Sequence, residues 1–552
     1  MSKTGDRAER TVSSMQWAAW ADALGWISEL TTAENLRRRT KGRPLTKPYP
    51  WQRQVGGRMG VRVDLPAGCY SDDTQLRLAT ARSVSSRGFD VEAFARVELP
   101  VWQSYALGGG RATKAAAAGM SKSNANWATN FYKDWENSGG NGAAMRIQPH
   151  VYAAADLRSF AHLDDVIKNA VVTHGHPNAL VGAVLHATAL TMALAEQIAP
   201  GPDRWPELLA TTRHAFRAFE RCQELASYWR PQWETVVSDN LERAWTDTVL
   251  QAERMFNAAR EVFDVLRVAT DESASTHGYE LLVKTLDLDN PQTRGSGLPT
   301  AVTAIVLAAA LPDHPAKAAT LAASRLNTDT DTIATMAAAI VAAIRPHELV
   351  SDVLDADYIA GEARRLTHIA RREPTSDFPY PDLLRWVPPK SGLDSVGIVN
   401  ENLVLAGLGW LEPISAAYNT QSANWQWMGV SNGATVLVKY RPEPLALHPN
   451  NWPALRPTDD ACLSIQMVSD APPDSSPPAQ LDKTLPGPDV KTDTLTNEEI
   501  SKMLAWLERQ GHSEYAIGYA LRRVIEIGTR TQVLEFANEL AQRLKENGSQ
   551  HH

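Results

Sequence analysis

The chain has very little cysteine. Only Cys69, Cys222 and Cys462 occur among its 552 residues, and no two of them have the spacing of a metal-binding or redox pair. A disulfide framework of the kind that stabilises small secreted proteins is therefore excluded, and such sparse use is typical of a reducing compartment. Residues 1–14 are polar and lack the apolar stretch of a secretory signal. We therefore expect a cytoplasmic protein.

Long hydrophobic runs and an excess of positive charge are also missing. A membrane-spanning helix needs about eighteen or more apolar residues in a row. The richest run, Leu298–Leu311, is interrupted by proline and threonine. The formal net charge of −8 disfavours a general electrostatic grip on nucleic acid, although it leaves room for a local basic groove. We expect no membrane partner, and nucleic acid is a disfavoured one.

What the chain does have is helical patterning over residues 15–372. The alanine-rich stretches Leu180–Gln197 and Asp331–Ile344 place apolar residues three and four apart, which is typical of core helices. The charged stretch Arg213–Arg267 carries Trp, Phe and Leu at helical spacing. It is interpreted as a peripheral amphipathic hairpin with its break at Pro231. We predict a compact all-α domain over residues 15–372.

The composition changes after this domain. Five prolines in Glu373–Pro389 discourage long helices and mark a boundary. Two short β-prone runs follow, Ile398–Leu405 and Ala434–Tyr440, and the second comes after the hairpin-type turn signal Ser431-Asn432-Gly433. These runs predict a small β-rich module over residues 390–470.

The C-terminal part combines a linker with helices. Residues 471–494 begin rich in proline, aspartate and serine, and are predicted to form a flexible linker. Thr496-Asn497-Glu498-Glu499 has the form of a capping box, and Gly511 and Gly528 divide the remainder, so we predict a helical bundle over residues 495–546. The predicted fold class is therefore mainly α, with a small β-containing module and a C-terminal helical bundle.

Two short acidic segments precede apolar helical runs. The first is Ser71-Asp72-Asp73, ahead of the run Leu76–Ser86, and the second is Asp329-Thr330-Asp331-Thr332. Neighbouring carboxylates repel each other, and a divalent ion would compensate them, with the hydroxyls as further hard oxygen ligands. The competing interpretation is helix capping, because Asp, Ser and Thr favour the start of a helix. The residues alone leave both open.

A second pair of acids, Asp22 and Glu29, lies in an otherwise apolar helical pattern. Seven residues separate them, which is two helical turns, so they share one face. Charges in such surroundings are costly unless they are paired. A structural salt bridge and a place in a binding site are equal alternatives for these two residues.

Glycine loops and a histidine pair complete the candidate groups. Gly108-Gly109-Gly110 and Gly139-Gly140-Asn141-Gly142 each precede a helical pattern, where bare backbone amides can approach a phosphate or a sugar. Thr173-His174-Gly175-His176-Pro177 makes a poor zinc site without nearby cysteine. Each of these signals is weak when it is taken alone.

The order of these segments is more specific than any one of them. The succession ADALGWISE, SDDTQ, GNGAAMRI, THGHP and TDTDTIA resembles the ADP-ribosylglycohydrolase family, which includes the activators of ADP-ribosylated dinitrogenase reductase. The resemblance implies a compact all-α domain with two Mg²⁺ or Mn²⁺ ions. It also implies a hydrolase that cleaves the glycosidic bond between ADP-ribose and an acceptor, with an ADP-ribosylated protein or a small ADP-ribose conjugate as its partner.

The resemblance also assigns roles to residues. It implies metal ligands in both acidic segments: Ser71, Asp72, Asp73, Asp329, Asp331 and Thr332. A carboxylate at the metals would activate water, and the sequence does not choose between Glu29 and Asp73 for this role. It implies an ADP-ribose groove lined by Gly108, Gly109, Gly110, Gly140, Asn141, Gly142, Met145 and His174, and it leaves Arg146 open to a structural role.

Three departures from the family pattern bear on function. Ser71 replaces the usual threonine and keeps the hydroxyl, Ala21 replaces a glycine, and Asn327-Thr328 replaces a Gly-Gly pair. The last change puts affinity or substrate choice in doubt, but not metal binding. Two alternatives are a catalytically inactive ADP-ribose-binding or structural protein of the same fold, and a hydrolase of ADP-ribosylated nucleic acid or of a small conjugate. The complete set of oxygen donors disfavours the first.

Overall fold

The computed structural model describes residues 6–122, 125–454 and 497–509, the single residues 517, 520, 521 and 524, and residues 529–548. The chain divides into two compact units, Met1–Ile465 and Gln466–His552. Helices dominate, and a small antiparallel sheet follows the helical domain, so the mainly α fold class predicted from the sequence is confirmed. The first unit contains both the predicted helical domain and the strands of the predicted β-rich module.

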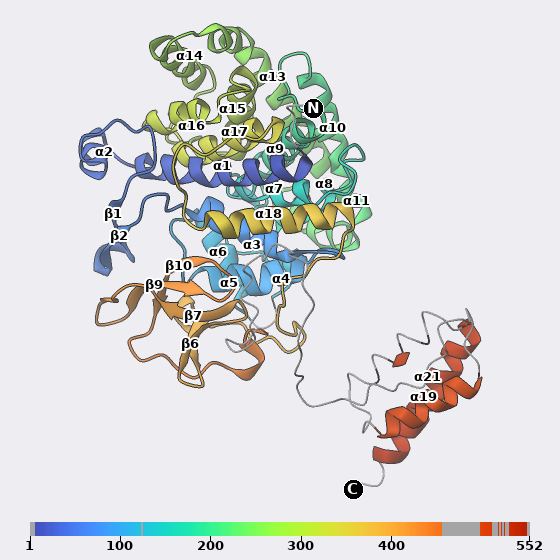
Figure 1. The fold of residues 1–552 in the computed structure, drawn as a ribbon. Helices are drawn as coiled ribbons and strands as arrows, with labels where there is room; N and C mark the ends of the chain where they lie inside the picture. The colour runs from blue at the N-terminus through green and yellow to red at the C-terminus, as the bar shows by residue number, and fades with distance from the viewer. Residues whose placement is uncertain are drawn as a thin grey trace. The chain divides into compact units, whose positions relative to one another are not determined.

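Alanine-rich helices form the core of the first unit (Figure 1). They are α1 (Arg7–Ser28), α9 (Pro177–Glu196), α15 (Gly297–Ala310), α16 (Pro315–Ser324), α17 (Thr330–Ile344) and α18 (Ala356–Arg371). Every residue of α17 is buried, and α1 packs along it so closely that a Cβ atom at Gly25 would overlap the Thr330 carbonyl oxygen. Small side chains let helices approach one another, which explains why alanine and glycine recur here.

The helix α9 confirms the helical prediction for the Leu180–Gln197 stretch. Among the described residues, α9 is the one helix long and apolar enough to cross a membrane. However, 89% of its apolar 18-residue window is buried inside the fold. Pro177 occupies its first turn, where a missing N–H costs nothing, and the His176 side chain accepts a hydrogen bond from the Asn178 N–H. Its apolar character therefore belongs to the protein core.

The peripheral stretch is helical as predicted, but its break lies elsewhere. Pro231 lies at the start of α12 (Arg230–Val237), which continues directly from the π-helical turn Leu225–Trp229, so the helical path runs on through the proline. The chain reverses instead at Ser238, whose φ of 56° is left-handed, and the Asn240 side chain then caps α13 (Leu241–Val268). The prediction of a break at Pro231 is therefore wrong.

Further α-helices complete the first unit. They are α2 (Ala33–Thr40), α3 (Asp72–Ser83), α4 (Val91–Ala93), α5 (Leu99–Trp102), α6 (Arg111–Met120), α7 (Gln148–Tyr152), α8 (Leu163–Val171), α10 (Trp205–His214), α11 (Ala218–Arg221) and α14 (Glu272–Thr285). The helix α3 ends before the predicted Ser86, because β3 (Val84–Ser85) pairs with β4 (Gly88–Phe89).

A β-hairpin that the sequence analysis missed interrupts the helical domain. Its strands β1 (Trp51–Val55) and β2 (Val61–Leu65) pair antiparallel, with Trp51 opposite Leu65. Trp51, Val63 and Leu65 are buried in the core. The alternation of apolar and polar residues along β2 is a strand signal, but it is short and stands among long helical patterns.

Six strands form the sheet after the helical domain. They are β5 (Val396–Val399), β6 (Asn402–Leu405), β7 (Gly409–Pro413), β8 (Tyr418–Asn419), β9 (Asn424–Val430) and β10 (Thr435–Tyr440), in the order β10-β9-β7-β6-β5 with β8 beside β9. The hairpin predicted at Ser431-Asn432-Gly433 is confirmed. The run Ile398–Leu405 falls in two strands rather than one, because Asn400 and Glu401 both adopt positive φ and form a two-residue turn.

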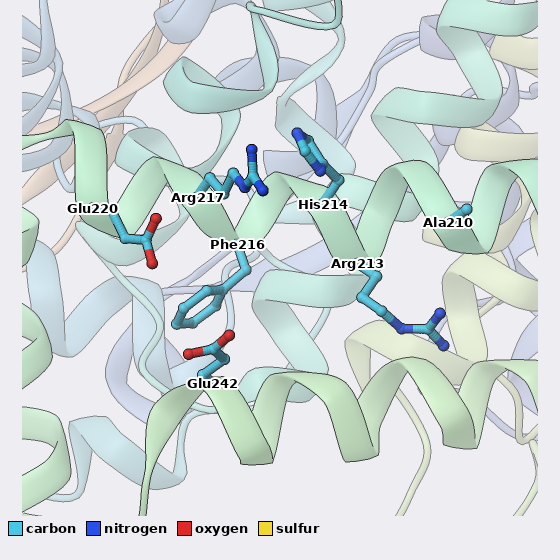
Figure 2. A pocket seen from close by; sticks show the side chains of 7 residues that line it. All are labelled: Ala210, Arg213, His214, Phe216, Arg217, Glu220 and Glu242. Carbon is cyan, nitrogen blue, oxygen red and sulfur yellow. The ribbon is translucent and has the colours of Figure 1, made fainter.

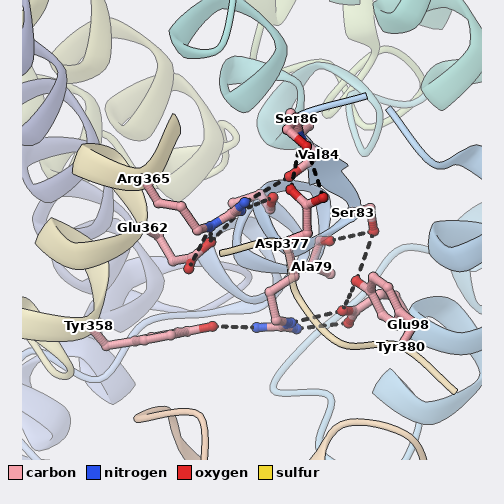
Figure 3. Close-up of polar contacts among 12 residues, drawn as sticks. Ala79, Ser83, Val84, Ser86, Glu98, Tyr358, Glu362, Arg365, Asp377 and Tyr380 are labelled. Atoms are coloured by element: carbon pink, nitrogen blue, oxygen red, sulfur yellow. Dashed lines mark hydrogen bonds and ion pairs between the residues drawn. The ribbon is translucent and has the colours of Figure 1, made fainter. Parts of the chain in front are cut away.

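A buried ionic network anchors the C-terminal end of α3 (Figure 3). Arg82 donates to both carboxylate oxygens of Glu98, at 2.8 and 2.7 Å. Tyr380, from the proline-rich segment after α18, donates to Glu98 at 2.6 Å, and Asp377 of the same segment accepts hydrogen bonds from the amide and hydroxyl of Ser86. The segment has no regular structure, as expected, yet its side chains hold α3 in place.

The second unit contains α19 (Asn497–Arg509) and α21 (Arg530–Gly548). They share a small apolar core that includes Met503, Leu507, Ala520, Val524 and Phe536. Within the predicted helical segment 495–546, residues 497–509 and 530–546 are helical. The predicted linker 471–494, Thr496 of the capping box, and Gly511 and Gly528 lie outside the described residues.

Glu98→Gln should destabilise the first unit by about 3 kcal/mol, because Arg82 then keeps its charge inside the protein without a counter-charge. The two side chains are 0% and 5% exposed. The matched control is Glu34→Gln, which breaks an ion pair with Arg38 whose side chains are 74% and 70% exposed, and it should change little. Chemical denaturation followed by circular dichroism measures both variants, and equal losses would contradict the anchoring role of the network.

Removing everything after Asp470 should leave the melting temperature of the first unit unchanged, because that unit has its own continuous core. A chain that ends at Glu373 should melt well below the full-length protein or fail to fold, because it loses Tyr380, Asp377 and the whole sheet. Differential scanning calorimetry compares the three proteins. A lower melting temperature for the first truncation would show that the first unit depends on residues beyond 470.

Candidate functional site

The two acidic segments of the sequence lie together at the starts of α3 and α17. Ser71 caps α3 by accepting the Asp73 N–H at 3.2 Å, and Asp329 caps α17 by accepting the Thr332 N–H at 3.3 Å. The Thr332 hydroxyl lies 3.4 Å from Asp73 Oδ1 and donates to it, which joins the two helix starts. Capping and assembly of a site are therefore not alternatives here, since the same residues cap the helices and face one another.

Asp22 of α1 holds the first acidic segment in place. Its carboxylate is fully buried and accepts the Ser71 N–H at 3.0 Å, the Thr74 N–H at 2.9 Å and the Thr74 hydroxyl at 2.6 Å. Arg77, which is also fully buried, donates to the Thr74 hydroxyl at 3.2 Å. Through these three hydrogen bonds Asp22 fixes the loop before α3.

Glu29 caps the C-terminal end of α1, one residue beyond the helix. A carboxylate at this end meets the negative pole of the helix dipole, so its charge needs another partner. Arg53 on β1 supplies it, with Nη1 at 3.8 Å from Glu29 Oε2. The salt bridge that the sequence left open is thus present, and the Glu29 side chain still keeps 25% of its surface exposed.

Four carboxyl groups of this cluster have raised pKa values. Burial and repulsion by neighbouring acids raise the pKa of Asp72 to about 6 and the pKa of Glu29 to about 7. The same two causes hold the pKa values of Asp73 and Asp331 well above their usual range. The structure therefore gathers Glu29 and both acidic segments in one region of low dielectric, which we call the acidic cluster.

The acidic cluster fits a divalent cation by its donors but is not closed around one. Asp73 Oδ2 is buried and has no hydrogen-bond partner, whereas Asp72 accepts the Gly109 N–H at 2.7 Å and Asp329 accepts the Asn141 side-chain amide at 2.9 Å. Across the described residues, no three Asp, Glu, His or Cys side chains are placed to hold a metal ion as they stand. Carboxylate and hydroxyl oxygens are the ligands that Mg²⁺ and Mn²⁺ prefer. The donor chemistry of these residues therefore suits such an ion, whereas Asp72 and Asp329 are engaged by other donors.

The first glycine loop faces the acidic cluster. Gly108 and Gly109 have φ values of 136° and 102°, and a Cβ atom at Gly108 would overlap Asp72 Oδ1. Only a glycine allows this approach of backbone to carboxylate. Gly110 ends the loop as the N-cap of α6, and the space where its Cβ would lie is open. The loop thus donates to the Asp72 carboxylate through the Gly109 N–H, and it leaves open space at Gly110, where α6 starts.

The second glycine loop connects the acidic cluster to His174. Gly140 lies beside His174, and the Asn141 N–H donates to the Gly295 carbonyl at 2.9 Å. A Cβ atom at Gly142 would lie 3.1 Å from the His174 ring, which is tighter than an ordinary contact. Burial lowers the pKa of His174 to about 3, so the ring is neutral near pH 7.

Met145 and Arg146, from the same motif, lie in the protein interior. Met145 is 3% exposed and belongs to the hydrophobic core, so its side chain does not line a groove. Arg146 is fully buried and donates to the Gly142 carbonyl at 2.9 Å, to Asn169 Oδ1 at 2.8 Å and to the Thr173 hydroxyl at 2.8 Å. Arg146 holds the glycine loop against the helix α8, which is a structural role.

The sequence analysis missed two arginines that shape the site. Arg77 donates to Gln148 at 2.8 Å and to Thr335 at 2.6 Å. A charged residue within an apolar helical run needs hydrogen-bond partners inside the protein, so the sequence did carry a signal for this arginine. Arg53 gave no such signal, because the hairpin that carries it was not predicted. Thr74 and Gly295 also touch the site, and neither has a residue type that points to a role there.

A hollow of about 500 Å³ lies away from these residues, on the peripheral helices (Figure 2). It is lined by Ala210, Arg213, His214, Phe216, Arg217, Glu220 and Glu242. None of the predicted site residues lines it, and its exposed charges are of both signs. Mixed charges on the outer faces of helices are typical of a solvated surface, so we assign no function to this hollow.

Comparison with known proteins agrees with the order of the motifs. The family model described as ADP-ribosylglycohydrolase matches residues 3–374, about two thirds of the chain. A solved structure described as an ADP-ribosylglycohydrolase-related protein complex aligns with 66% of this chain and 99% of its own chain, at 20% sequence identity and a TM-score of 0.40. No match was found among the curated proteins. The family match spans both acidic segments and both glycine loops, and the chain belongs to the ADP-ribosylglycohydrolase family.

Proposed function

We propose that this protein is a divalent-metal-dependent hydrolase that cleaves the glycosidic bond between ADP-ribose and a modified acceptor, with a protein side chain as the acceptor. The observation that carries the proposal is the acidic cluster, in which Asp73 Oδ2 is buried without a hydrogen-bond partner. An unpaired carboxylate oxygen among other buried acids is costly, and a bound cation would remove that cost. Family membership supports ADP-ribose as the substrate class of the proposal.

Two Mg²⁺ or Mn²⁺ ions are the proposed cofactors. The residues that would hold them are Ser71, Asp72, Asp73, Asp329, Asp331 and Thr332. Bound ions of this kind polarise oxygen atoms of a substrate and lower the pKa of water. This chain contributes the backbone positions: hydrogen bonds fix both helix starts, so only the Asp72 and Asp329 side chains would have to leave their present donors.

Of the two carboxylates considered for water activation, Glu29 suits proton transfer better. A quarter of its side chain is exposed, so water reaches it, and its pKa of about 7 lets it take up and release a proton near neutral pH. Asp73 is buried where α3 meets α17 and accepts a hydrogen bond from Thr332, which suits a fixed ligand. Negative charge around the anomeric carbon would also stabilise an oxocarbenium-like transition state.

The ADP-ribose groove is proposed along the two glycine loops. Gly110 begins the ten-residue helix α6 and has open space beside it, and the N-terminus of a helix favours an anion such as a diphosphate. Asn141 of the second loop donates to Asp329 in the acidic cluster, and Gly140 and Gly142 of the same loop lie beside His174. A ligand that spans both loops would place its ribose over the acidic cluster.

A panel of defined substrates tests the proposal. It contains ADP-ribosyl-arginine and ADP-ribosyl-serine peptides, an ADP-ribose ester and an ADP-ribosylated oligonucleotide, each incubated with Mg²⁺, with Mn²⁺ or with a chelator. We expect release of ADP-ribose from at least one peptide, and only with metal. Binding of ADP-ribose without hydrolysis would favour an inactive binding protein, and full turnover with the chelator would rule out metal dependence.

Asp73→Asn should stabilise the metal-free protein and abolish its response to metal. Burial raises the pKa of Asp73, so its ionisation weakens the fold increasingly as the pH rises, and Asn cannot ionise. We expect the variant to melt roughly 2 to 4 °C higher near pH 8, which corresponds to about 1 kcal/mol, and to show a smaller gain near pH 5. Thermal melting with and without Mn²⁺ measures both effects.

The control for this variant is Glu280→Gln on the exposed face of α14, which should change neither the melting temperature nor the metal response. Turnover of Asp73→Asn should fall to the background rate. A normal rise in melting temperature with Mn²⁺ in this variant would show that Asp73 is not needed to hold the metal.

Gly142→Val should weaken ADP-ribose binding at least tenfold, a loss of about 1.4 kcal/mol. The new side chain would press against the His174 ring and the Thr113 hydroxyl, each 3.1 Å from the position of a Cβ atom. Metal content should not change, because the proposed ligands lie on other segments. Calorimetry with free ADP-ribose and metal analysis of the same sample provide the test, and Gly201→Ala, which meets only an ordinary contact with Phe263, is the control. Unaltered affinity in folded Gly142→Val would remove this loop from the groove.

A further inference from the structure

An arginine on the β1–β2 hairpin faces Glu29. The two side chains are about three-quarters buried, with 24% and 25% of their surfaces exposed, and Arg53 Nη1 lies 3.8 Å from Glu29 Oε2. The Arg53 guanidinium also lies over the Trp26 ring at 4.9 Å, and Trp26 packs edge-to-face against Trp51 at 5.1 Å. Contact with an aromatic face restrains an arginine in addition to the attraction of the carboxylate.

The distance between the two charges is informative. At 3.8 Å the pair is close enough for strong attraction in partly buried surroundings but too long for a hydrogen bond. Arg53 Nη1 has no hydrogen-bond partner, so the arginine attracts Glu29 without occupying its lone pairs. The backbone at this point is held separately, because Arg39 donates to the Ile27 carbonyl at 2.6 Å. Glu29 is therefore restrained while its oxygens stay available to water.

The place of the hairpin is set by the sheet β5–β10. The Tyr418 hydroxyl donates to the Asp64 carboxylate at 3.2 Å, and the Trp427 indole N–H donates to the Asp64 carbonyl at 3.0 Å. The Trp425 ring lies so close to Gly56 in the hairpin turn that a side chain there would not fit. All three aromatic residues lie beyond residue 374, where the family match ends.

We propose that Arg53 is a positioning residue for Glu29, and that the sheet β5–β10 acts on this site by fixing the β1–β2 hairpin. The inference rests on the proposed hydrolase function. Asp72 and Asp329 repel Glu29, so without Arg53 the carboxylate would turn away from the acidic cluster toward solvent. Arg53 counters this repulsion and keeps Glu29 where water meets the proposed metal ligands.

Steady-state kinetics on full-length, metal-loaded protein tests this role, with the ADP-ribosylated peptide that the substrate panel selects. Arg53→Gln should lower kcat about tenfold and leave KM within about twofold, because Glu29 acts on water rather than on binding. Arg53→Lys should recover most of kcat, since attraction at 3.8 Å needs charge rather than a hydrogen-bonding fork. The matched control is Arg62→Gln on the exposed face of β2, which should behave as the wild type.

A second variant tests the part played by the sheet. Trp427→Phe keeps the aromatic ring but removes the donor to Asp64, so the hairpin loosens while Arg53 remains. We expect a smaller loss of kcat in the same direction, again without a change in KM. Melting temperatures of all variants show whether each remains folded.

The outcomes separate the two proposals. A wild type that hydrolyses no substrate overturns the proposed function, whereas an active wild type with unchanged kcat in Arg53→Gln overturns this inference alone. A loss confined to KM would mean that Arg53 binds the substrate itself, and an Arg53→Lys variant as impaired as Arg53→Gln would mean that packing rather than charge matters. Either result overturns the proposal that the charge of Arg53 positions Glu29. Unchanged kcat in Trp427→Phe would remove the sheet from the inference.

Discussion

Burying several carboxylates beside one another is costly, and much of the first unit is arranged around that cost. Asp22, Asp72, Asp73 and Asp331 all lie in the interior, where each loses hydration and repels the others. Hydrogen-bond donors offset part of this cost. Backbone N–H groups donate to Asp22 and Asp72, and the side-chain amide of Asn141 donates to Asp329. Hydrogen-bond donors lower the cost of burying these carboxylates but do not supply the positive charge that would neutralise them.

The helix α3, which carries Asp72 and Asp73, is held at both ends, so these two carboxylates cannot easily move away from the other acids. Its first turn is fixed by Asp22 through Ser71 and Thr74, and its last turn by the buried pair of Arg82 and Glu98. With both ends held, the acidic loop cannot swing toward solvent to separate its charges. Fixing both ends of the helix in this way limits how far Asp72 and Asp73 can move apart, although Asp72 stays engaged by the Gly109 N–H.

Local patterns and motif order predicted a good part of this protein. Alanine runs gave α9 and α17, and the Ser431–Gly433 signal gave a hairpin, because such elements depend on neighbouring residues. The acidic segments and glycine loops were found as short motifs, and the structure brings them together. Contacts between distant residues were not predictable: Arg82 reaches a tyrosine 276 positions away, and nothing in the sequence pairs them. The role of Arg53 was missed for the same reason.

The contacts that support the acidic cluster extend beyond residue 374, where the family match ends. Asp355, within the match, accepts hydrogen bonds from the Tyr70 hydroxyl at 2.7 Å and from the Thr435 N–H at 2.9 Å. Tyr70 directly precedes Ser71. Asp355 therefore links Thr435 of the sheet to the residue next to the first acidic segment. Through Asp64 and the β1–β2 hairpin it is also linked to Glu29. The sheet thus contacts Asp355, which holds Tyr70 beside the proposed ligands, and Asp64, in the hairpin that carries the partner of the proposed base. The positions of these groups decide how far a carboxylate can move. A change in the sheet can therefore alter the site without any change in the motifs themselves.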